Sequence, residues 1–188
     1  MLMLALQAGG APVRAALRYE YAAVMGGQLW RLLSAHFVHL GWIHCLLNLA
    51  AFGLCVLLSR GSLSGRFWWG ASLAIGLGVG ILLLLVSPDV PNYVGLSGVV
   101  YGLFVCVLGP QAWRGERASL VLLLLVLLRI AWQLLVESPD AQLELIGGSV
   151  VAQAHLYGAG CGLAWAVGQA LLTPRHRLGI SRPFDSLG

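Results

Sequence analysis

Long stretches without a charged residue are the feature that most limits how this chain can fold. No Lys, Arg, Asp or Glu occurs in Ala35–Leu58, Trp68–Val86 or Val150–Leu172, and Ser119–Val136 carries only Arg129. Each stretch is close to the ~20 residues that a helix needs to cross the hydrocarbon of a bilayer. Because 59% of the chain is hydrophobic and 10% is charged, and no alternating β-barrel pattern is present, we predict an all-α polytopic membrane protein.

The arginines predict how this bundle lies in the membrane. Most of the eleven basic residues, all of them arginines, lie in two connections and the C-terminal tail: Arg60, Arg66, Arg114, Arg117, Arg175, Arg177 and Arg182. The connections SPDVPNY and VESPDAQLELIGG hold acidic residues and no basic one. Basic loops stay cytoplasmic, so we expect a cytoplasmic C-terminus and an outward-facing segment around Tyr93. Arginines scattered between spans do not indicate nucleic-acid binding.

The N-terminal part is harder to interpret. Met1–Gln7 is apolar but far too short to span a bilayer, and the five visible spans put Arg14 and Arg18 outside. Either the protein has five spans, or residues 1–7 belong to a first span whose beginning is missing. We expect one membrane domain over residues 1–188. It would comprise a partial first span and outer loop (1–34), five spans (35–172) and a cytoplasmic tail (173–188).

A serine between glycines begins the shortest apolar segment, NYVGLSGVVYGLFV. We expect a helix from Ser97 to Leu108, ended by Gly109 and Pro110, with a length of roughly 18 Å. The hydrocarbon is ~30 Å thick, so Ser97 should lie about 10 Å below the outer surface, in a wet cavity that tolerates non-helical backbone. The unpaired N–H groups and dipole of a helix N-terminus favour a developing oxyanion.

A histidine in the last stretch provides the base that serine chemistry needs. Two helical faces are smooth enough for close approach, one bearing Gly98 and Gly102 and the other bearing Gly158 and Gly162. Contact between these faces would bring His155 to Ser97, with Tyr101 one turn further along as an aromatic stop for the imidazole. An ionisable residue inside a membrane span is a candidate for function.

A simpler alternative is that Ser97 only caps its helix and that Gly95, Gly98 and Gly102 only serve packing. All the nearby acidic residues lie in connections: Asp89, Glu137, Asp140 and Glu144. A Ser-His-Asp triad is therefore not expected. We predict a dyad in which Tyr101 and packing orient the histidine in place of an acid.

His44 and Asn48 lie four residues apart on one face of an apolar stretch. Two neutral donors on one face suit the stabilisation of an oxyanion in a dry site. A metal site made by His36, His39 and His44 is the alternative. His39 and His44 do not share a helical face, and no acidic or thiolate ligand is placed to help, so we expect neither a metal nor a cofactor.

These segments, in this order, resemble the rhomboid family of intramembrane serine proteases over nearly the whole chain. Trp30 and Arg31 look like the WR motif of the family's first outer loop, and His39 lies at the position of an upstream histidine. The other matches are HxxxN at His44–Asn48, GxSGxxYG at Gly95–Gly102, and HxxGxxxG at His155–Gly162. The family's bacterial core has six spans, of which the first would be short or truncated here.

The resemblance implies a role for each of these residues. Ser97 would be the nucleophile and His155 the general base, with Tyr101 packed under it. His44, Asn48 and the backbone N–H of Ser97 would form the oxyanion hole. No cofactor is implied, and the partners would be transmembrane protein substrates in the lipid bilayer.

Within the family, the short chain and the residues in and around its motifs are similar to those of the rhombosortases. That subfamily implies an enzyme of the bacterial inner membrane whose site opens to the periplasm. Its substrates are secreted proteins with a C-terminal sorting signal of Gly-Gly, a hydrophobic helix and a basic cluster. Glycines break helices cheaply, and small residues would fit a pocket bounded by Gly95 and Gly98.

Three alternatives differ from this interpretation. A generic rhomboid protease would cut other substrates, and a rhomboid-like binding protein would grip transmembrane helices without cutting. A small transporter would carry paired charges within its spans, where only Arg129 is found. We expect Arg129 to snorkel toward the outer surface; contact with a substrate or a lipid phosphate is the alternative.

Overall fold

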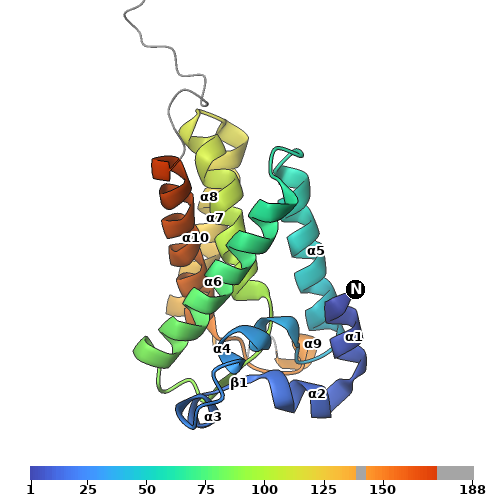
Figure 1. Cartoon of the computed structure of the whole chain (residues 1–188). Helices are drawn as coiled ribbons and strands as arrows, with labels where there is room; N and C mark the ends of the chain where they lie inside the picture. Colours follow the sequence, from blue (N-terminus) through green and yellow to red (C-terminus); the bar gives the residue numbers. More distant parts are fainter. Residues whose placement is uncertain (139–142, 173–188) are drawn as a thin grey trace, which may run out of the picture.

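Helix α7 (Ser97–Trp113) is the centre of a helical bundle in the computed structural model, which describes residues 1–138 and 143–172 (Figure 1). Four helices of 17 to 22 residues surround it: α5 (Trp42–Leu58), α6 (Gly65–Val86), α8 (Arg117–Leu135) and α10 (Ala152–Leu172). Side chains on every face of α7 are buried, among them Val99, Leu103 and Leu108. A helix that is hydrophobic all round is expected at the middle of a bundle. The predicted all-α membrane bundle is confirmed.

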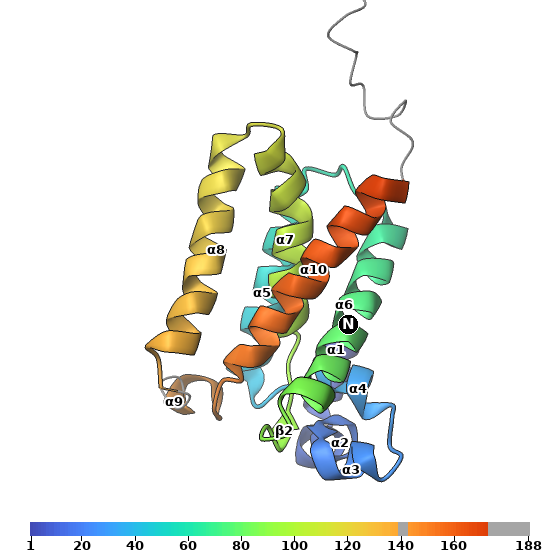
Figure 2. The ribbon, with the colours of Figure 1, turned by 90° about the vertical axis from the view of Figure 1, so that its left-hand side faces the viewer.

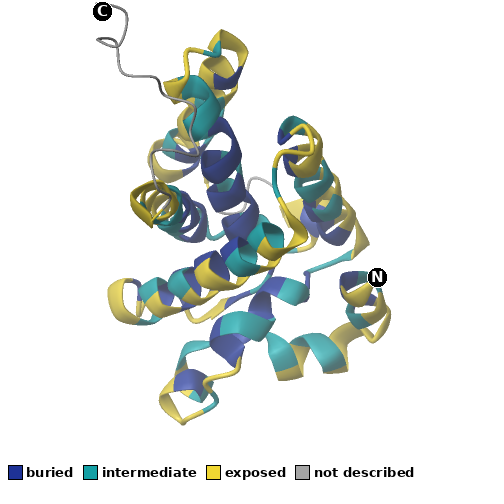
Figure 3. Cartoon of the chain, turned by 45° about the horizontal axis from the view of Figure 1, so that its top comes forward, coloured by how far each residue is buried: buried dark blue, intermediate teal, exposed yellow. Residues whose placement is uncertain are grey.

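The outer helices expose apolar side chains rather than polar ones. Figure 3 shows buried residues along α7 and exposed residues on the surrounding helices. On α8, large residues such as Val121, Leu124 and Leu128 are more than half exposed. Such a surface is stable when lipid covers it. In the described part of the chain, α6 and α8 are long and apolar enough to cross a membrane, and residues 31–58 add a third such segment if its bent halves count together.

The first apolar stretch differs from the continuous helix expected over Ala35–Leu58. Residues 35–37 form the 3-10 helix η1 after the short helix α4 (Arg31–Ser34), and α5 begins only at Trp42. The two parts meet at an angle of 92°. His36 holds the first part against α6, because its Nε2 donates to the carbonyl oxygen of Gly76 at 2.8 Å. The bend places α4 against α6 and η1 against α7 rather than in line with α5.

The prediction that Gly109 and Pro110 end α7 is wrong. The helix passes through Pro110 and ends at Trp113, since a proline removes a single backbone donor and the following turn has other partners. The Gln111 side chain donates to the carbonyl oxygen of Leu58 at 2.9 Å and accepts from the Ser119 hydroxyl at 2.6 Å. At about 25 Å the helix is longer than expected, and Ser97 is recessed by about 5 Å if Trp113 marks the membrane surface.

The short elements gather at the end of the bundle where α7 begins (Figures 1 and 2). They are α1 (Leu2–Ala8), α2 (Gly10–Leu17), β1 (Tyr19–Glu20), α3 (Tyr21–Met25), α4, η1, β2 (Asn92–Tyr93) and α9 (Leu143–Ile146). We call this the site end. Helix α1 packs against α2, η1 and α5. Its seven residues are too few to cross the hydrocarbon.

The opposite end, which we call the arginine end, carries the connections from α5 to α6 and from α7 to α8 (Figure 1). Arg60 of the first connection forms an ion pair with Glu116 of the second. Arg114 lies in the same connection as Glu116. These two basic connections therefore share one end of the bundle, and Ser97 lies toward the other. The predicted cytoplasmic tail lies outside the described residues.

Candidate active site

The backbone leading to Ser97 is attached to the N-terminal part of the chain. Strands β1 and β2 pair antiparallel, with Tyr19 opposite Tyr93. The Gly95 N–H donates to the carbonyl oxygen of Ala35 at 3.0 Å, and the Tyr93 hydroxyl donates to the Gly95 carbonyl at 2.7 Å. Gly95 has a φ of +117°, a backbone conformation that favours glycine. These contacts set the direction in which the chain enters α7.

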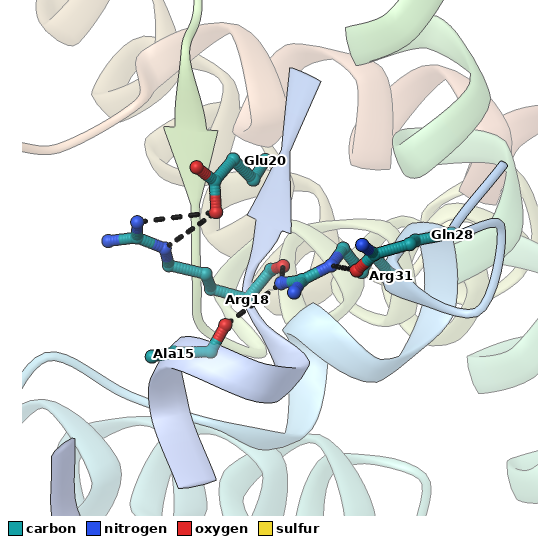
Figure 4. Close-up of polar contacts among 5 residues, drawn as sticks. All are labelled: Ala15, Arg18, Glu20, Gln28 and Arg31. Carbon is teal, nitrogen blue, oxygen red and sulfur yellow. Dashed lines mark hydrogen bonds and ion pairs between the residues drawn. The ribbon is translucent and has the colours of Figure 1, made fainter. Parts of the chain in front are cut away.

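Arg31 joins three segments of the outer loop. Its guanidinium donates to the carbonyl oxygens of Ala15 at 2.9 Å and Arg18 at 2.7 Å, and to the Gln28 side chain at 2.6 Å (Figure 4). The Arg31 side chain is buried, so these bonds compensate for the loss of hydration. Its neighbour Trp30 is 56% exposed. The WR pair therefore lies away from Ser97, and its arginine has a structural role in the fold.

The two glycine faces of α7 and α10 are in contact. A Cβ atom added at Gly158 would overlap the Gly98 carbonyl, and one added at Gly162 would overlap the Gly102 carbonyl. A Cβ at Gly98 would lie 2.9 Å from the Ala154 carbonyl oxygen. Backbone therefore touches backbone along this interface, as small residues allow in membrane bundles. Gly98 faces α10, which corrects the expectation that it bounds a substrate pocket.

The close packing of α7 and α10 brings Ser97 and His155 together. The Ser97 hydroxyl oxygen lies 2.9 Å from His155 Nε2, which is an ordinary hydrogen-bond distance. His155 is 5% exposed and lies in the first turns of α10. A hydroxyl at this distance from a neutral imidazole can pass its proton to the ring while its oxygen attacks an electrophile.

Tyr101 stacks on the imidazole, as the sequence predicted. The ring centroids of Tyr101 and His155 are 4.4 Å apart and the planes are inclined by 31°. Tyr101 lies one turn after Ser97 on α7, so a single helix carries the hydroxyl and the ring that limits the imidazole's movement. The stacking holds the plane of the ring, but it does not determine which nitrogen carries the proton.

Gln133 is a site residue that the sequence analysis did not identify. Its side-chain oxygen lies 2.7 Å from His155 Nδ1, on the side of the ring opposite Ser97. The available signal was its position four residues after Arg129, on the same face of an otherwise apolar helix. Gln133 was overlooked because only charged residues within the spans were considered as candidates. Gln133 is 8% exposed and comes from α8, a helix that no sequence motif connects to the site.

His44 and Asn48 line the same cavity as Ser97. A Cβ at Gly95 would lie 2.9 Å from His44 Nε2 and 3.6 Å from Asn48 Nδ2, so both side chains approach the backbone just before Ser97. The Leu40 N–H points at His44 Nδ1 at 3.4 Å. Because an N–H can only donate, Nδ1 accepts and the ring hydrogen is on Nε2. Asn48 Nδ2 is buried and has no partner in the described chain.

His39 supports the backbone next to Ser97. Its Nε2 accepts a hydrogen bond from the Leu96 N–H at 3.4 Å. Because an N–H can only donate, this nitrogen accepts and the ring hydrogen of neutral His39 is on Nδ1. His36 Nε2 donates to the Gly76 carbonyl at 2.8 Å, and its Nδ1 faces the Gly95 carbonyl at 3.4 Å without a second ring hydrogen to donate. Across the described residues, no group of three His, Cys, Asp or Glu side chains has the geometry of a metal site.

A cavity of about 560 Å³ extends from Ser97 along α7 between α5 and α8. Polar residues line it at the site end, and the apolar walls beyond them include Ala51, Leu54, Phe104, Leu122 and Val126. Arg129 also lines the cavity and forms an ion pair with Glu137, just beyond the end of α8. Its guanidinium therefore reaches toward the site end, which is the direction expected for a snorkelling arginine.

A comparison with models of protein families found a match over the part of the chain that holds Ser97 and His155. A model of the rhomboid domain matches residues 26–170, which is most of the chain and includes every site residue described above. No curated protein matches the chain. The chain therefore belongs to the rhomboid family, integral membrane proteins that cut transmembrane substrates as intramembrane serine proteases.

Proposed function

We propose that Ser97 and His155 cleave the transmembrane segment of a substrate near the outer face of the membrane. The observation that carries this proposal is the 2.9 Å contact between the Ser97 hydroxyl and His155 Nε2 at the head of a long cavity. The hydroxyl oxygen would attack a peptide carbonyl while its proton moves to Nε2. Collapse of the adduct would return that proton to the leaving amine, and water would then release the acyl group from Ser97.

The negative oxygen of this adduct needs donors, and two side chains are available. His44 carries its ring hydrogen on Nε2, because the Leu40 N–H points at Nδ1. Asn48 Nδ2 is a buried donor with no partner in the described chain. A buried donor that stays unpaired costs free energy, and a site that forms an oxyanion recovers it. The Ser97 N–H, at the start of α7, would be the third donor.

The cavity suits an extended or partly unwound helix. It runs beside α7 between α5 and α8, and its apolar walls would take hydrophobic side chains at about 25 cal/mol per Å² of buried area. Peptide bonds inside an intact helix are shielded, so the substrate must unwind near Ser97. Residues of low helix propensity at that point reduce the cost, glycine by ~1 kcal/mol relative to alanine.

We further propose that the protein has the substrate specificity of a rhombosortase, which the residues in and around its motifs suggest. A Gly-Gly pair just outside a C-terminal hydrophobic helix would unwind easily beside Ser97. A basic cluster after that helix would remain cytoplasmic, together with the arginine end and the C-terminus of this chain. The protein would then lie in a bacterial inner membrane with its site open to the periplasm. The whole chain, residues 1–188, would form one such domain.

The test is a reconstituted protein with a reporter that carries Gly-Gly, a hydrophobic helix and a basic tail. Mass spectrometry of the new C-terminus should place the cut at or beside the Gly-Gly pair. A matched reporter with Leu-Leu should be cut much more slowly. Equal cleavage rates for the two reporters would contradict the Gly-Gly specificity and indicate a generic rhomboid protease. If neither reporter is cut and a serine-directed probe leaves Ser97 unlabelled, the chain binds helices without cutting them.

A further inference from the structure

A base that takes a proton from Ser97 must present a lone pair at Nε2. A neutral imidazole carries one ring hydrogen, and either nitrogen can hold it. If the hydrogen is on Nε2, His155 cannot accept the Ser97 proton. Serine proteases commonly use a carboxylate at the other nitrogen to select the correct tautomer. In the described part of the chain, no carboxylate hydrogen-bonds to His155.

The Gln133 side chain occupies the place of that carboxylate. Its Oε1 lies 2.7 Å from His155 Nδ1, while Ser97 lies 2.9 Å from Nε2 on the other side of the ring. An amide oxygen can only accept, so the Nδ1 partner must be N–H and Nε2 keeps its lone pair. Gln133 and His155 are both buried, and water does not compete freely for either group.

Helix α8 holds Gln133 in this position by packing against α7 and α10. Ile130, one turn earlier, is buried against Val105 of α7 and Ala159 of α10. Arg129, one turn before Gln133, pairs with Glu137, which follows the end of the helix. The amide is therefore built into the contact between α8 and the two helices that carry Ser97 and His155.

We propose that Gln133 is a positioning residue that acts through His155 as a neutral third member of the site. This inference rests on the proposed serine protease function. When the Ser97 proton moves to Nε2, the ring becomes an imidazolium whose Nδ1–H still donates to the amide oxygen. The proton leaves again from Nε2 to the leaving amine, and the Nδ1 hydrogen does not move. Gln133 thus selects the tautomer, holds the ring and stabilises its positive charge without accepting a proton.

The alternative is that Gln133 is only a link between α8 and α10. Three variants separate these roles. Gln133→Met keeps the length and apolar bulk of the side chain and removes the acceptor. Gln133→Glu keeps an acceptor oxygen at the same place. Gln111→Met is the matched control, because it removes a hydrogen-bonded glutamine from the arginine end, where the bonds are to Leu58 and Ser119.

The full chain in detergent would be treated with a fluorescent alkyl fluorophosphonate, and the labelling rate at Ser97 and Tm would be measured. We expect Gln133→Met to label about tenfold more slowly, the factor that one ordinary hydrogen bond is worth. Gln133→Glu should recover most of the rate, and Gln111→Met should label like the wild type. With a transmembrane reporter, the loss in Gln133→Met should appear in kcat rather than KM.

Wild-type labelling by Gln133→Met would overturn the inference and leave the proposed function intact. A second outcome would also overturn the inference. In it, Gln133→Met labels more slowly, Gln133→Glu does not recover the rate, and the loss of labelling matches the fall in Tm as it does for Gln111→Met. That pattern would assign Gln133 a structural role. If the wild type neither labels nor cuts, the proposed function fails first and the inference fails with it.

Discussion

Gly158 lies against the carbonyl of Gly98 so closely that a methyl group at position 158 would overlap the backbone of α7. This contact determines the distance between the helix that carries the candidate nucleophile and the helix that carries the candidate base. One turn further along each helix, the contact of Gly162 with Gly102 repeats it. The contact between Ser97 and His155 therefore depends on four glycines, because a side chain at these positions would push α7 and α10 apart.

Gly158→Ala should lower both stability and activity. The added methyl cannot fit without moving α10, and overpacking of this kind costs about 1–3 kcal/mol. The same movement would take His155 away from Ser97, so fluorophosphonate labelling should fall more than tenfold. Gly160→Ala is the control on the same helix, since a Cβ there meets no atom within 4 Å. That variant should keep its activity, and equal effects of the two changes would contradict the packing argument.

Ser97→Ala and His155→Ala should each abolish cleavage while the protein remains folded. Loss of the nucleophile or of its base typically costs several orders of magnitude in rate. Because the two groups act as a unit, the double variant should be hardly worse than either single one. Cleavage of a transmembrane reporter and labelling by the fluorophosphonate both report the loss. Robust cleavage by Ser97→Ala would contradict the assignment of the nucleophile.

Asn48→Ala should lower activity without a large loss of stability. Removing one donor from an oxyanion hole typically lowers kcat by about 100-fold or more. The buried amide nitrogen of Asn48 has no partner in the described residues, so its removal leaves no broken hydrogen bond, and Tm should not fall strongly. The measurement is kcat on the reporter together with a melting curve in detergent. A large fall in Tm with unchanged kcat would mean that Asn48 is structural.

A chelator should not change the rate of cleavage. His36 directs its ring nitrogens at two backbone carbonyls, and His39 Nε2 accepts from the Leu96 N–H. Of these three histidines, only His44 lines the cavity, and metal sites need at least three protein ligands. Activity measured with and without EDTA checks this. Loss of activity that zinc restores would bring back the histidine-cluster hypothesis.

The sequence by itself determined the class of fold and pointed to Ser97, His155 and Tyr101 as neighbours. Long uncharged stretches require helices in a bilayer because unpaired backbone groups are not tolerated there. Glycines at helical spacing beside Ser97 and His155 indicated two smooth faces, and the faces meet as expected. Such inferences succeed because helical periodicity places residues of one helix on a common face.

Only the tertiary structure decided how the outer elements and α8 relate to Ser97. The bend before Trp42, the passage of α7 through Pro110 and the bond from Gln133 to His155 all depend on contacts between distant segments. Helical spacing says which residues share a face, but it does not say which neighbouring helix that face meets. The order of α8 against α7 and α10 comes from side-chain packing, with Ile130 against Val105 and Ala159. For that reason an uncharged glutamine without a motif became visible as part of the site only in the folded chain.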